Sequence, residues 1–337
     1  MRILIAGNPD PVHVGAHFRN AADSLGWQVD FMNTEEASKG WPILQKASWH
    51  LAGHRPLRLN RFSDSVLHRC QEFRPHALIT TGLAPVTAEI LQKLAAMGIP
   101  TVNFLTDDPF NSAHHASWFL QALRQYSCVF SPRQANMNDL RKAGAKSVHY
   151  LPFAYAPEIH FAAAPCDTVE PPIADVLFAG GADDDRVPYL SALAKSGLTL
   201  LLYGGYWRRH RDCAPYWRGM ATPQMLRHAV ASTKTTLCLV RRMNRDGSCM
   251  RTFEAPAMGA CMLTEDTDEH RAIFGEDGDA VCYFRTIPEM ISKAHWLANN
   301  MSERTRLAAS AHHKITSDGH TYKDRLIEIA SVCGLPK

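Results

Sequence analysis

Short apolar runs alternate with amphipathic stretches along most of the chain. In its first half the runs have the length and composition of buried strands and lie at 3–6, 29–32, 77–80, 101–105, 128–131 and 148–151. Between them, helical spacing of apolar residues occupies 17–25, 62–73, 86–97, 113–125 and 134–143. Compact apolar strands that alternate with helices predict a parallel sheet covered on both faces.

The same alternation restarts in the second half. Strands are predicted at 176–179, 199–203, 236–240, 261–264 and 280–283, and helices at 187–195, 223–231, 251–258, 287–299, 303–316 and 322–333. Five prolines between 152 and 172 predict a linker. The resulting fold class is α/β, with two doubly wound Rossmann-like domains facing each other across a cleft. The expected parts are an N-terminal domain (1–152), a linker (153–172), a second domain (173–320) and a C-terminal helix (321–337) that packs back on the first domain.

One segment breaks the pattern. Residues 39–61 contain two tryptophans and several prolines and glycines, which predicts a loop or an excursion that lines a pocket. In doubly wound sheets, ligands bind beyond the carboxyl ends of the strands. The cleft between two such domains is therefore the expected binding site.

Composition excludes several classes of protein. The 337 residues carry a net charge of only +3, so binding to nucleic acid is not expected. Short basic clusters at 208–211 and 241–242 fit a few phosphates better than a polymer. Nine cysteines without a C-x-x-C pair argue for a reducing compartment. With neither a signal peptide nor a membrane-spanning run, we expect a cytoplasmic protein.

The most informative motif runs from Arg251 to Thr264. It places the carboxylate of Glu254 in the first turns of a predicted helix that ends at Gly259. Asp246 lies eight residues upstream of Glu254. Such an acid often only faces water and favours the helix dipole. Two acids at this spacing also suit a ribose diol and a sugar, while the N–H groups at the start of the helix take the phosphates between them.

Glycines and arginines at the predicted strand ends extend this nucleotide-sugar interpretation. Gly180 and Gly181 end the first strand of the second domain and permit close approach of a ligand, and Arg186 is a candidate clamp for a diphosphate. Gly204 and Tyr206 repeat the pattern after the next strand, where the aromatic ring is either a platform for a base or part of a buried turn. Arg242 is a further phosphate candidate.

Candidate catalytic residues lie in the first domain. The loop after the first strand lacks G-x-G-x-x-G, but it presents Asp10 and His13. His13 is a candidate general base or a residue that only orders the backbone. His13 and His17 have the spacing of a helical metal site, but without a third ligand no metal is predicted. Asp108, in the Asp107-Asp108-Pro109 loop, is a sugar ligand, a base or a turn residue.

The order of these motifs resembles the CgeB-like (spore maturation protein type) glycosyltransferases of the GT-B superfamily. The features that carry the resemblance are Gly180-Gly181 with Arg186, the run 203–207, the motif from 251 to 260, and His320-Thr321-Tyr322 with Arg325. Residues 107–109, 131–154 and the acidic stretch 265–269 also fit. The resemblance implies a GT-B glycosyltransferase that moves a sugar from a nucleotide-sugar donor in the second domain to an acceptor on the first, without a metal. No cofactor is implied beyond the UDP-, GDP- or dTDP-linked co-substrate.

By position in the resemblance, Glu254 matches the carboxylate that holds the donor ribose, and Arg251 is included among the donor-binding residues. Asp246 falls at the first acidic position of an E-x7-E pattern but is one methylene shorter. Pro256 is a second departure, and it predicts a helix that starts late or kinks.

Several alternatives stay open at this stage. A retaining reaction would use the donor phosphate held by Arg186 or Arg242, whereas an inverting reaction would need His13 or Asp108 as base. A nucleotide-sugar epimerase and a non-catalytic sugar-nucleotide-binding or assembly protein are the competing functions. The acceptor and the oligomeric state are not assigned by the sequence.

Overall fold

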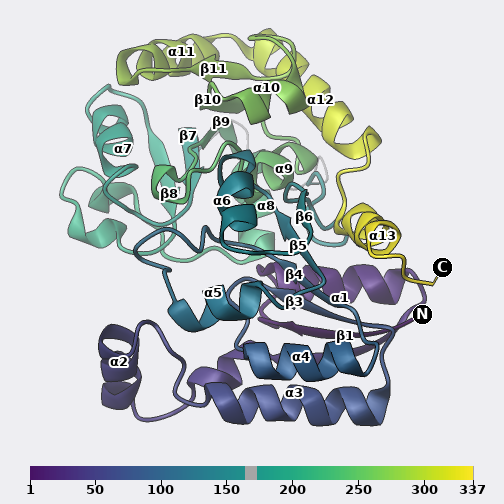
Figure 1. The fold of residues 1–337 in the computed structure, drawn as a ribbon. Helices are drawn as coiled ribbons and strands as arrows, with labels where there is room; N and C mark the ends of the chain where they lie inside the picture. Colours follow the sequence, from purple (N-terminus) through teal and green to yellow (C-terminus); the bar gives the residue numbers. More distant parts are fainter. Residues whose placement is uncertain (164–172, 337) are drawn as a thin grey trace. The chain divides into compact units, whose positions relative to one another are not determined.

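A computed structural model describes residues 1–163 and 173–336 of the chain (Figure 1). Its contacts group the chain into two compact units. The first unit comprises Met1–Pro152, Met243–Arg245 and the segment that begins at Tyr322. The second unit comprises Phe153–Arg242 and Asp246–Thr321.

The first unit contains a six-stranded parallel sheet of order β2-β1-β3-β4-β5-β6. Its strands are β1 (Arg2–Gly7), β2 (Gln28–Asn33), β3 (Ala77–Thr81), β4 (Thr101–Phe104), β5 (Cys128–Ser131) and β6 (Val148–Tyr150). β3, β4 and β5 are buried along their whole lengths, as expected for central strands of a sheet covered on both faces.

Helices pack on both faces of this sheet. The helices of this unit are α1 (Val14–Ser24), α2 (Pro42–Leu51), α3 (Leu59–Phe73), α4 (Ala88–Ala96), α5 (Ser117–Leu123), α6 (Met137–Lys142) and α13 (Tyr322–Val332). Of these, α2 does not pack on the sheet and lies beyond the end of α3 (Figure 1). α13 docks on α1, where the His17 and Tyr322 rings stack at 4.7 Å and Phe18 meets Tyr322 edge-on. The C-terminal helix is thereby part of the first unit.

The second unit contains a five-stranded parallel sheet of order β11-β10-β9-β7-β8. Its strands are β7 (Ala174–Ala179), β8 (Leu200–Tyr203), β9 (Thr233–Cys238), β10 (Met262–Glu265) and β11 (Cys282–Phe284). Its helices are α7 (Val187–Ala194), α8 (Pro223–Ala231), α9 (Met250–Ala257), α10 (Asp268–Phe274), α11 (Ile287–Asn299) and α12 (Met301–Ser317). A separate apolar core, formed by one face of the sheet with α7 and α11, lies within this unit.

These two parallel sheets confirm the predicted α/β fold class. The strand at 236–240 is displaced, since β9 occupies Thr233–Cys238. The stretch 265–269, which the sequence suggested was an acidic loop, is instead the end of β10 and the start of α10, because the Thr267 side chain caps the helix by accepting from His270 N.

Two further expectations are corrected. Residues 39–61 do not form a loop, because they contain α2, which starts at Pro42 in the first turn, and the beginning of α3. α9 does not start late. It begins at Met250, Glu254 lies in its second turn, and Pro256 sits near its C-terminal end.

The predicted linker falls partly outside the described residues, since 164–172 are not among them. The segment before it is packed, with Phe153, Ala154 and Ala156 all buried, and Tyr155 N donates to His320 O at 3.0 Å. Within residues 1–163 and 173–336, the model contains no helix that is both long and apolar enough to cross a bilayer.

Candidate functional site

The carboxyl ends of β7 and β8 meet through glycines. Gly204 has φ +124°, and a Cβ built on it would lie 2.2 Å from the Gly180 carbonyl oxygen. The same carbonyl accepts a hydrogen bond from Trp207 Nε1 at 2.7 Å. Only glycine fits this contact, because a side chain would collide with backbone rather than with a movable group. The two predicted glycines therefore form one compact corner of the second unit.

Replacing Gly204 by alanine should destabilise the protein by about 2–3 kcal/mol, through positive-φ strain and overpacking. Gly205→Ala is the matched control, because its added Cβ would have no atom within 4 Å. Urea denaturation of the two variants measures the difference. Equal stabilities would show that the corner relaxes at no cost.

Arg186 lies beside this corner, immediately before α7. The residue is 8% exposed, and its guanidinium packs over the Phe178 ring at 5.7 Å. Nη1 reaches Gly181 O at 3.4 Å, and Nη2 reaches Leu239 O at 3.3 Å. Nε is buried and has no hydrogen-bond partner in the described part of the chain. The nearest carboxylate oxygen, from Asp183, is 3.5 Å away. A buried cation with an unused donor is a strong candidate for binding an anion.

Arg242 follows β9 and is already paired. Its Nη2 lies 2.8 Å from Glu265 Oε1 and donates to the Tyr189 hydroxyl. These partners raise the pKa of Arg242, with the Tyr189 hydrogen bond as the largest cause. Glu265 Oε2 in turn accepts from Val240 N at 2.7 Å. Arg242 is half exposed and can contact a ligand, but Glu265 already offsets part of its charge.

Asp246 is held by a loop that is fixed to the start of α10. Ser248 Oγ donates to Glu269 Oε2 at 2.9 Å, and Thr267 Oγ1 donates to Gly247 O at 2.6 Å. Asp246 is partly exposed. Its negative charge acts to raise the pKa of Cys249, the residue before α9. The loop therefore presents the Asp246 carboxylate at the N-terminal end of α9.

The residue that caps the start of α9 is a cysteine. Cys249 precedes the helix, and Thr252 Oγ1 accepts a hydrogen bond from Cys249 N at 3.0 Å. The Cys238 thiol, 3.7 Å away, lowers the pKa of Cys249 to about 7, and the positive charge of Arg186 acts in the same direction. The charges of Arg186 and Asp246 therefore both act on the thiol that precedes α9.

Glu254 differs from the sequence expectation. The residue is 4% exposed instead of lying open at a helix start. Its Oε2 pairs with Arg251 Nη1 at 2.6 Å, and its Oε1 lies 3.7 Å from His160 Nε2. Burial is the main reason that the pKa of His160 is lowered. The two predicted residues Arg251 and Glu254 therefore form one pair, and His160 is a neighbour that the sequence did not indicate.

His270 ties α9 to β10 beneath this site. Its Nε2 meets Thr252 Oγ1 at 2.9 Å, and its Nδ1 meets Glu265 O at 2.8 Å. Complete burial lowers the pKa of His270 from 6.5 to about 4. The imidazole is therefore neutral in the folded protein above about pH 4.

This shift predicts a stability loss in acid. Between pH 6.5 and 4 the unfolded chain binds a proton at His270 that the folded chain does not, so the free energy of unfolding should fall by up to about 3 kcal/mol as the pH drops. Urea denaturation of wild type and His270→Gln at pH 7.5 and 4.5 isolates this contribution. A pH dependence of the same size in the variant would contradict it. His68→Gln, at an exposed histidine, is the control.

Tyr206 is not in a buried turn. It is 62% exposed, has φ +72°, and Arg209 lies over its ring at 5.0 Å. Arg208 beside it is also exposed. The ring is available as a stacking surface, and its left-handed backbone turns the chain into a short helical turn at Trp207–Arg209.

In the first unit, the loop after β1 leads to His13. The side chain of His13 is exposed and makes no cap hydrogen bond to α1, although its backbone N donates to Asp10 O at 2.9 Å. His17, four residues on, is buried against Tyr322 and does not share a surface with it. Among the described residues no group of three or more potential ligands forms a metal site.

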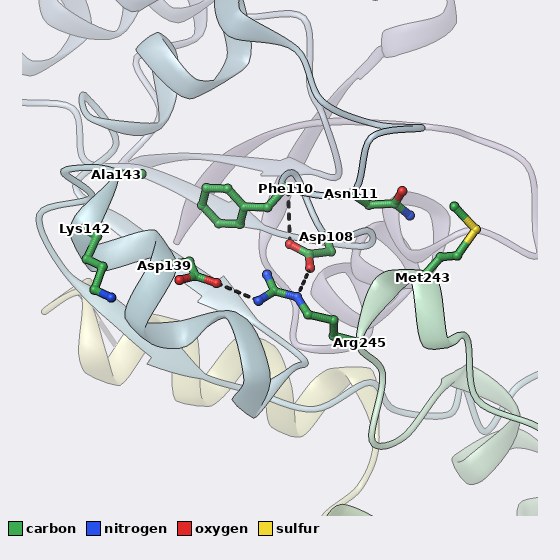
Figure 2. Close-up of a pocket in the computed structure, with 8 residues that line it drawn as sticks. All are labelled: Asp108, Phe110, Asn111, Asp139, Lys142, Ala143, Met243 and Arg245. Carbon is green, nitrogen blue, oxygen red and sulfur yellow. Dashed lines mark hydrogen bonds and ion pairs between the residues drawn. The ribbon is translucent and has the colours of Figure 1, made fainter.

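Asp108 is fully engaged and buried. Its Oδ2 lies 2.6 Å from Arg245 Nε, and its Oδ1 accepts from Phe110 N at 3.2 Å (Figure 2). Arg245 also reaches Asp139 Oδ2 at 2.6 Å. Asn244 Nδ2 donates to Asp107 Oδ1 at 3.1 Å. The aspartate predicted as a base is therefore an anchor for residues 243–245.

An open pocket of about 550 Å³ adjoins this anchor. Asp108, Arg245 and Asp139 are among its lining residues, and Figure 2 shows Arg245 between the two carboxylates. Its other lining residues are Phe110, Asn111, Lys142, Ala143 and Met243. An aromatic ring with charged and amide groups is a suitable lining for a polar organic molecule.

Besides His160 and His270, other residues of the site were missed from the sequence. Glu265 ends β10, and a carboxylate at the end of a strand is a recognisable signal. Thr267, with acids in the next two positions, is a helix start signal that was assigned to a loop. Arg245 carries no local signal, because its partner Asp108 is 137 residues away in sequence.

Comparison with known proteins identifies the class. Residues 186–331 match the family model described as glycosyl transferase-like. This match and the fold confirm the predicted class of enzyme, a glycosyltransferase. A search of the curated proteins found no match.

Solved structures match over the whole chain. Sucrose-phosphate synthase from Thermosynechococcus elongatus has a TM-score of 0.69 at 11% identity, with 98% of each chain covered. HepE of Anabaena in complex with UDP-glucose has a TM-score of 0.63 at 12% identity, covering 98% of this chain and 100% of that one. A DNA-modifying β-glucosyltransferase has a TM-score of 0.61 at 14% identity, with 99% and 100% covered. At these identities the likeness establishes the GT-B fold.

Proposed function

We propose that the protein transfers a glycosyl group from a nucleotide-sugar donor held by the second unit to an acceptor held by the first, without a metal ion. The observation that carries this proposal is the buried Arg186 guanidinium, whose Nε has no hydrogen-bond partner among the described residues. It lies at the glycine corner of Gly180 and Gly204, where a ligand can approach the backbone. HepE and the DNA-modifying enzyme were both crystallised with UDP-glucose, which supports a donor of this kind.

Each part of the donor has a proposed partner. The diphosphate lies against Arg186 and the N-terminal end of α9, where the helix dipole favours negative charge. Asp246 accepts from hydroxyls of the sugar. The ribose diol shares the Glu254 carboxylate with Arg251, and the base stacks on exposed Tyr206. Gly181 and Arg242 are the remaining residues of the proposed donor site. The glycosyl transferase-like match over residues 186–331 supports a donor site in the second unit, and we propose that the protein is CgeB-like.

The acceptor is proposed to bind on the first unit at the carboxyl end of its sheet, where the loops after β1 and β4 carry His13 and Asp108. Of the two predicted bases, His13 is the better candidate, because its side chain is exposed. Asp108 already uses both carboxylate oxygens to hold Arg245 and Phe110 N. We therefore propose His13 as the base and Asp108 as a residue that positions the loop after β4.

Thermal shift with UDP, GDP and dTDP, and with their sugars, tests donor binding. We expect at least one nucleotide to raise the melting temperature, and its sugar to be released slowly without an acceptor. No stabilisation by any of them would refute the donor site. Analysis of the sugar product separates transfer from epimerisation, and binding without turnover towards any acceptor would favour the assembly protein.

His13→Ala should lower turnover by about a hundredfold or more while leaving the affinity for the donor unchanged, since a general base acts only on the acceptor proton. Steady-state transfer rates and nucleotide titrations measure the two quantities. His68→Ala, at another exposed histidine, is the control. Unchanged turnover in His13→Ala would exclude an inverting route through this residue and favour retention.

A further inference from the structure

Residues 39–61, here termed the α2 excursion, are not used by the donor or acceptor sites. Their large apolar side chains face solvent: Trp41 is 77% exposed, Ile43 78% and Leu51 86%. Trp49 and Leu57 are also exposed, at 41% and 38%. Single exposed apolar residues are common, but five within seventeen positions form a cluster that indicates a binding surface.

The charge around this cluster has one sign. From 37 to 63 the sequence contains five basic residues and no acid. The basic residues are Lys39, Lys46, Arg55, Arg58 and Arg61. The three arginines are exposed, and Lys39 pairs with Glu36 just outside the excursion. The occupant of this surface is therefore expected to be both apolar and anionic.

The excursion is anchored at its base. Trp118 Nε1 donates to His54 O at 3.2 Å, and Arg58 N donates to Ala37 O at 2.8 Å. Ser48 Oγ donates to Arg55 O at 2.7 Å, closing the hairpin after α2. Figure 1 shows α2 at the rim of the first unit, beyond the end of α3. The apolar residues are thus presented outward on a fixed support.

We propose that the α2 excursion docks on an anionic lipid bilayer, lying in the interface with Trp41, Ile43 and Leu51 among the acyl chains. A short helix with exposed aliphatic and tryptophan side chains and adjacent basic residues has the composition of an interfacial anchor. Lys and Arg retain contact with the headgroups while their stems lie on apolar surface.

Charge separates this occupant from a second copy of the chain. A two-fold interface would place the same five basic residues of each copy together, with no acid from this segment to offset them. Nucleic acid would leave the aliphatic side chains without a partner. An anionic bilayer satisfies both the charge and the apolar surface. This inference does not depend on donor binding.

Vesicle co-sedimentation of the full-length protein tests the proposal, with phosphatidylcholine vesicles that contain or lack phosphatidylglycerol. We expect binding to the anionic vesicles that weakens at high salt. Ile43→Gln/Leu51→Gln should reduce it by about tenfold or more, because two buried aliphatic side chains are lost. Arg58→Gln/Arg61→Gln should reduce it by about fivefold or more, because each basic residue near the surface contributes to binding.

Met301→Gln/Ile327→Gln is the matched control, since both residues are exposed apolar positions on other helices. It should bind vesicles as wild type does. Nucleotide-induced thermal shifts, measured on all variants, separate this surface from the donor site. Equal binding to neutral and anionic vesicles, no vesicle binding by wild type, or a dimer in sedimentation velocity that the Ile43 and Leu51 changes dissociate would each overturn the proposal.

Discussion

Replacing Arg186 by alanine should weaken donor binding by about a hundred- to a thousandfold, since a desolvated guanidinium facing a diphosphate contributes a charge-assisted bond that water cannot replace. The effect should be large because Arg186 is only 8% exposed and its Nε has no hydrogen-bond partner among the described residues. Asp183, whose Oδ2 lies 3.5 Å from Nη1, offsets part of the charge and leaves the Nε donor for a ligand. Lysine at this position should recover only part of the affinity, because it cannot present a planar pair of donors.

Calorimetric titration with the nucleotide that gives the largest thermal shift measures this loss. Arg306→Ala, at an exposed arginine of the same unit, is the control and should change the affinity by less than about threefold. Arg186 also supports Leu239 O and Gly181 O, so the variants need a check of folding by circular dichroism. Arg186→Lys keeps a cation there if alanine proves too unstable. Wild-type affinity in a folded Arg186→Ala protein would remove the diphosphate from this position.

The fold was largely predictable because both sheets are parallel and buried on both faces. A strand such as β8 is short and wholly apolar, so periodicity locates it without knowledge of its partners. β9 was misplaced by three residues at its start, because its first half, Thr233 to Thr236, is polar in sequence although Thr235 and Thr236 are buried. The pattern of apolar residues alone does not reveal a threonine whose side chain is buried in a core.

The site was only partly predictable. The sequence indicated the glycines at these strand ends, and Gly204 is required for packing against the Gly180 backbone, whereas the approach of a ligand there stays a prediction. Whether a carboxylate is exposed to solvent or paired depends on residues that are distant in the sequence. Glu254 is closed off by His160, 94 positions earlier in the sequence, and no sequence pattern near Glu254 reports this. Its assignment to the ribose therefore stays a proposal in which the diol shares a carboxylate already bound to Arg251.

Because Glu254 is paired with Arg251, glutamine tests its role better than alanine does. Alanine there would leave the partly buried Arg251 without its anion, so loss of donor binding would be confounded by loss of stability. Glutamine keeps the size and one oxygen of the side chain. A ribose-specific effect then appears as weaker binding of ribonucleotides with an unchanged melting temperature in the absence of ligand.

Removing Arg245 should destabilise the protein by about 3–4 kcal/mol, because Asp108 is 1% exposed and would keep a buried charge with no cation. The value lies towards the low end of the range for buried pairs, since the Arg245 side chain is 37% exposed. Asp108→Asn should cost less, because Arg245 can turn to solvent or to Asp139. Urea denaturation of both single variants and of the double variant gives the coupling energy directly.

A double variant that is more stable than the sum of the single effects would confirm the pair as an anchor of residues 243–245. Lys93→Ala, which breaks the exposed pair with Glu89, is the control and should leave the free energy of unfolding almost unchanged. Additive effects would instead mean that the charges do not depend on each other. The cycle also separates the two roles of Asp108: an anchor loses turnover in Arg245→Ala and Asp108→Asn alike, whereas a base loses it in Asp108→Asn and retains it in Arg245→Ala.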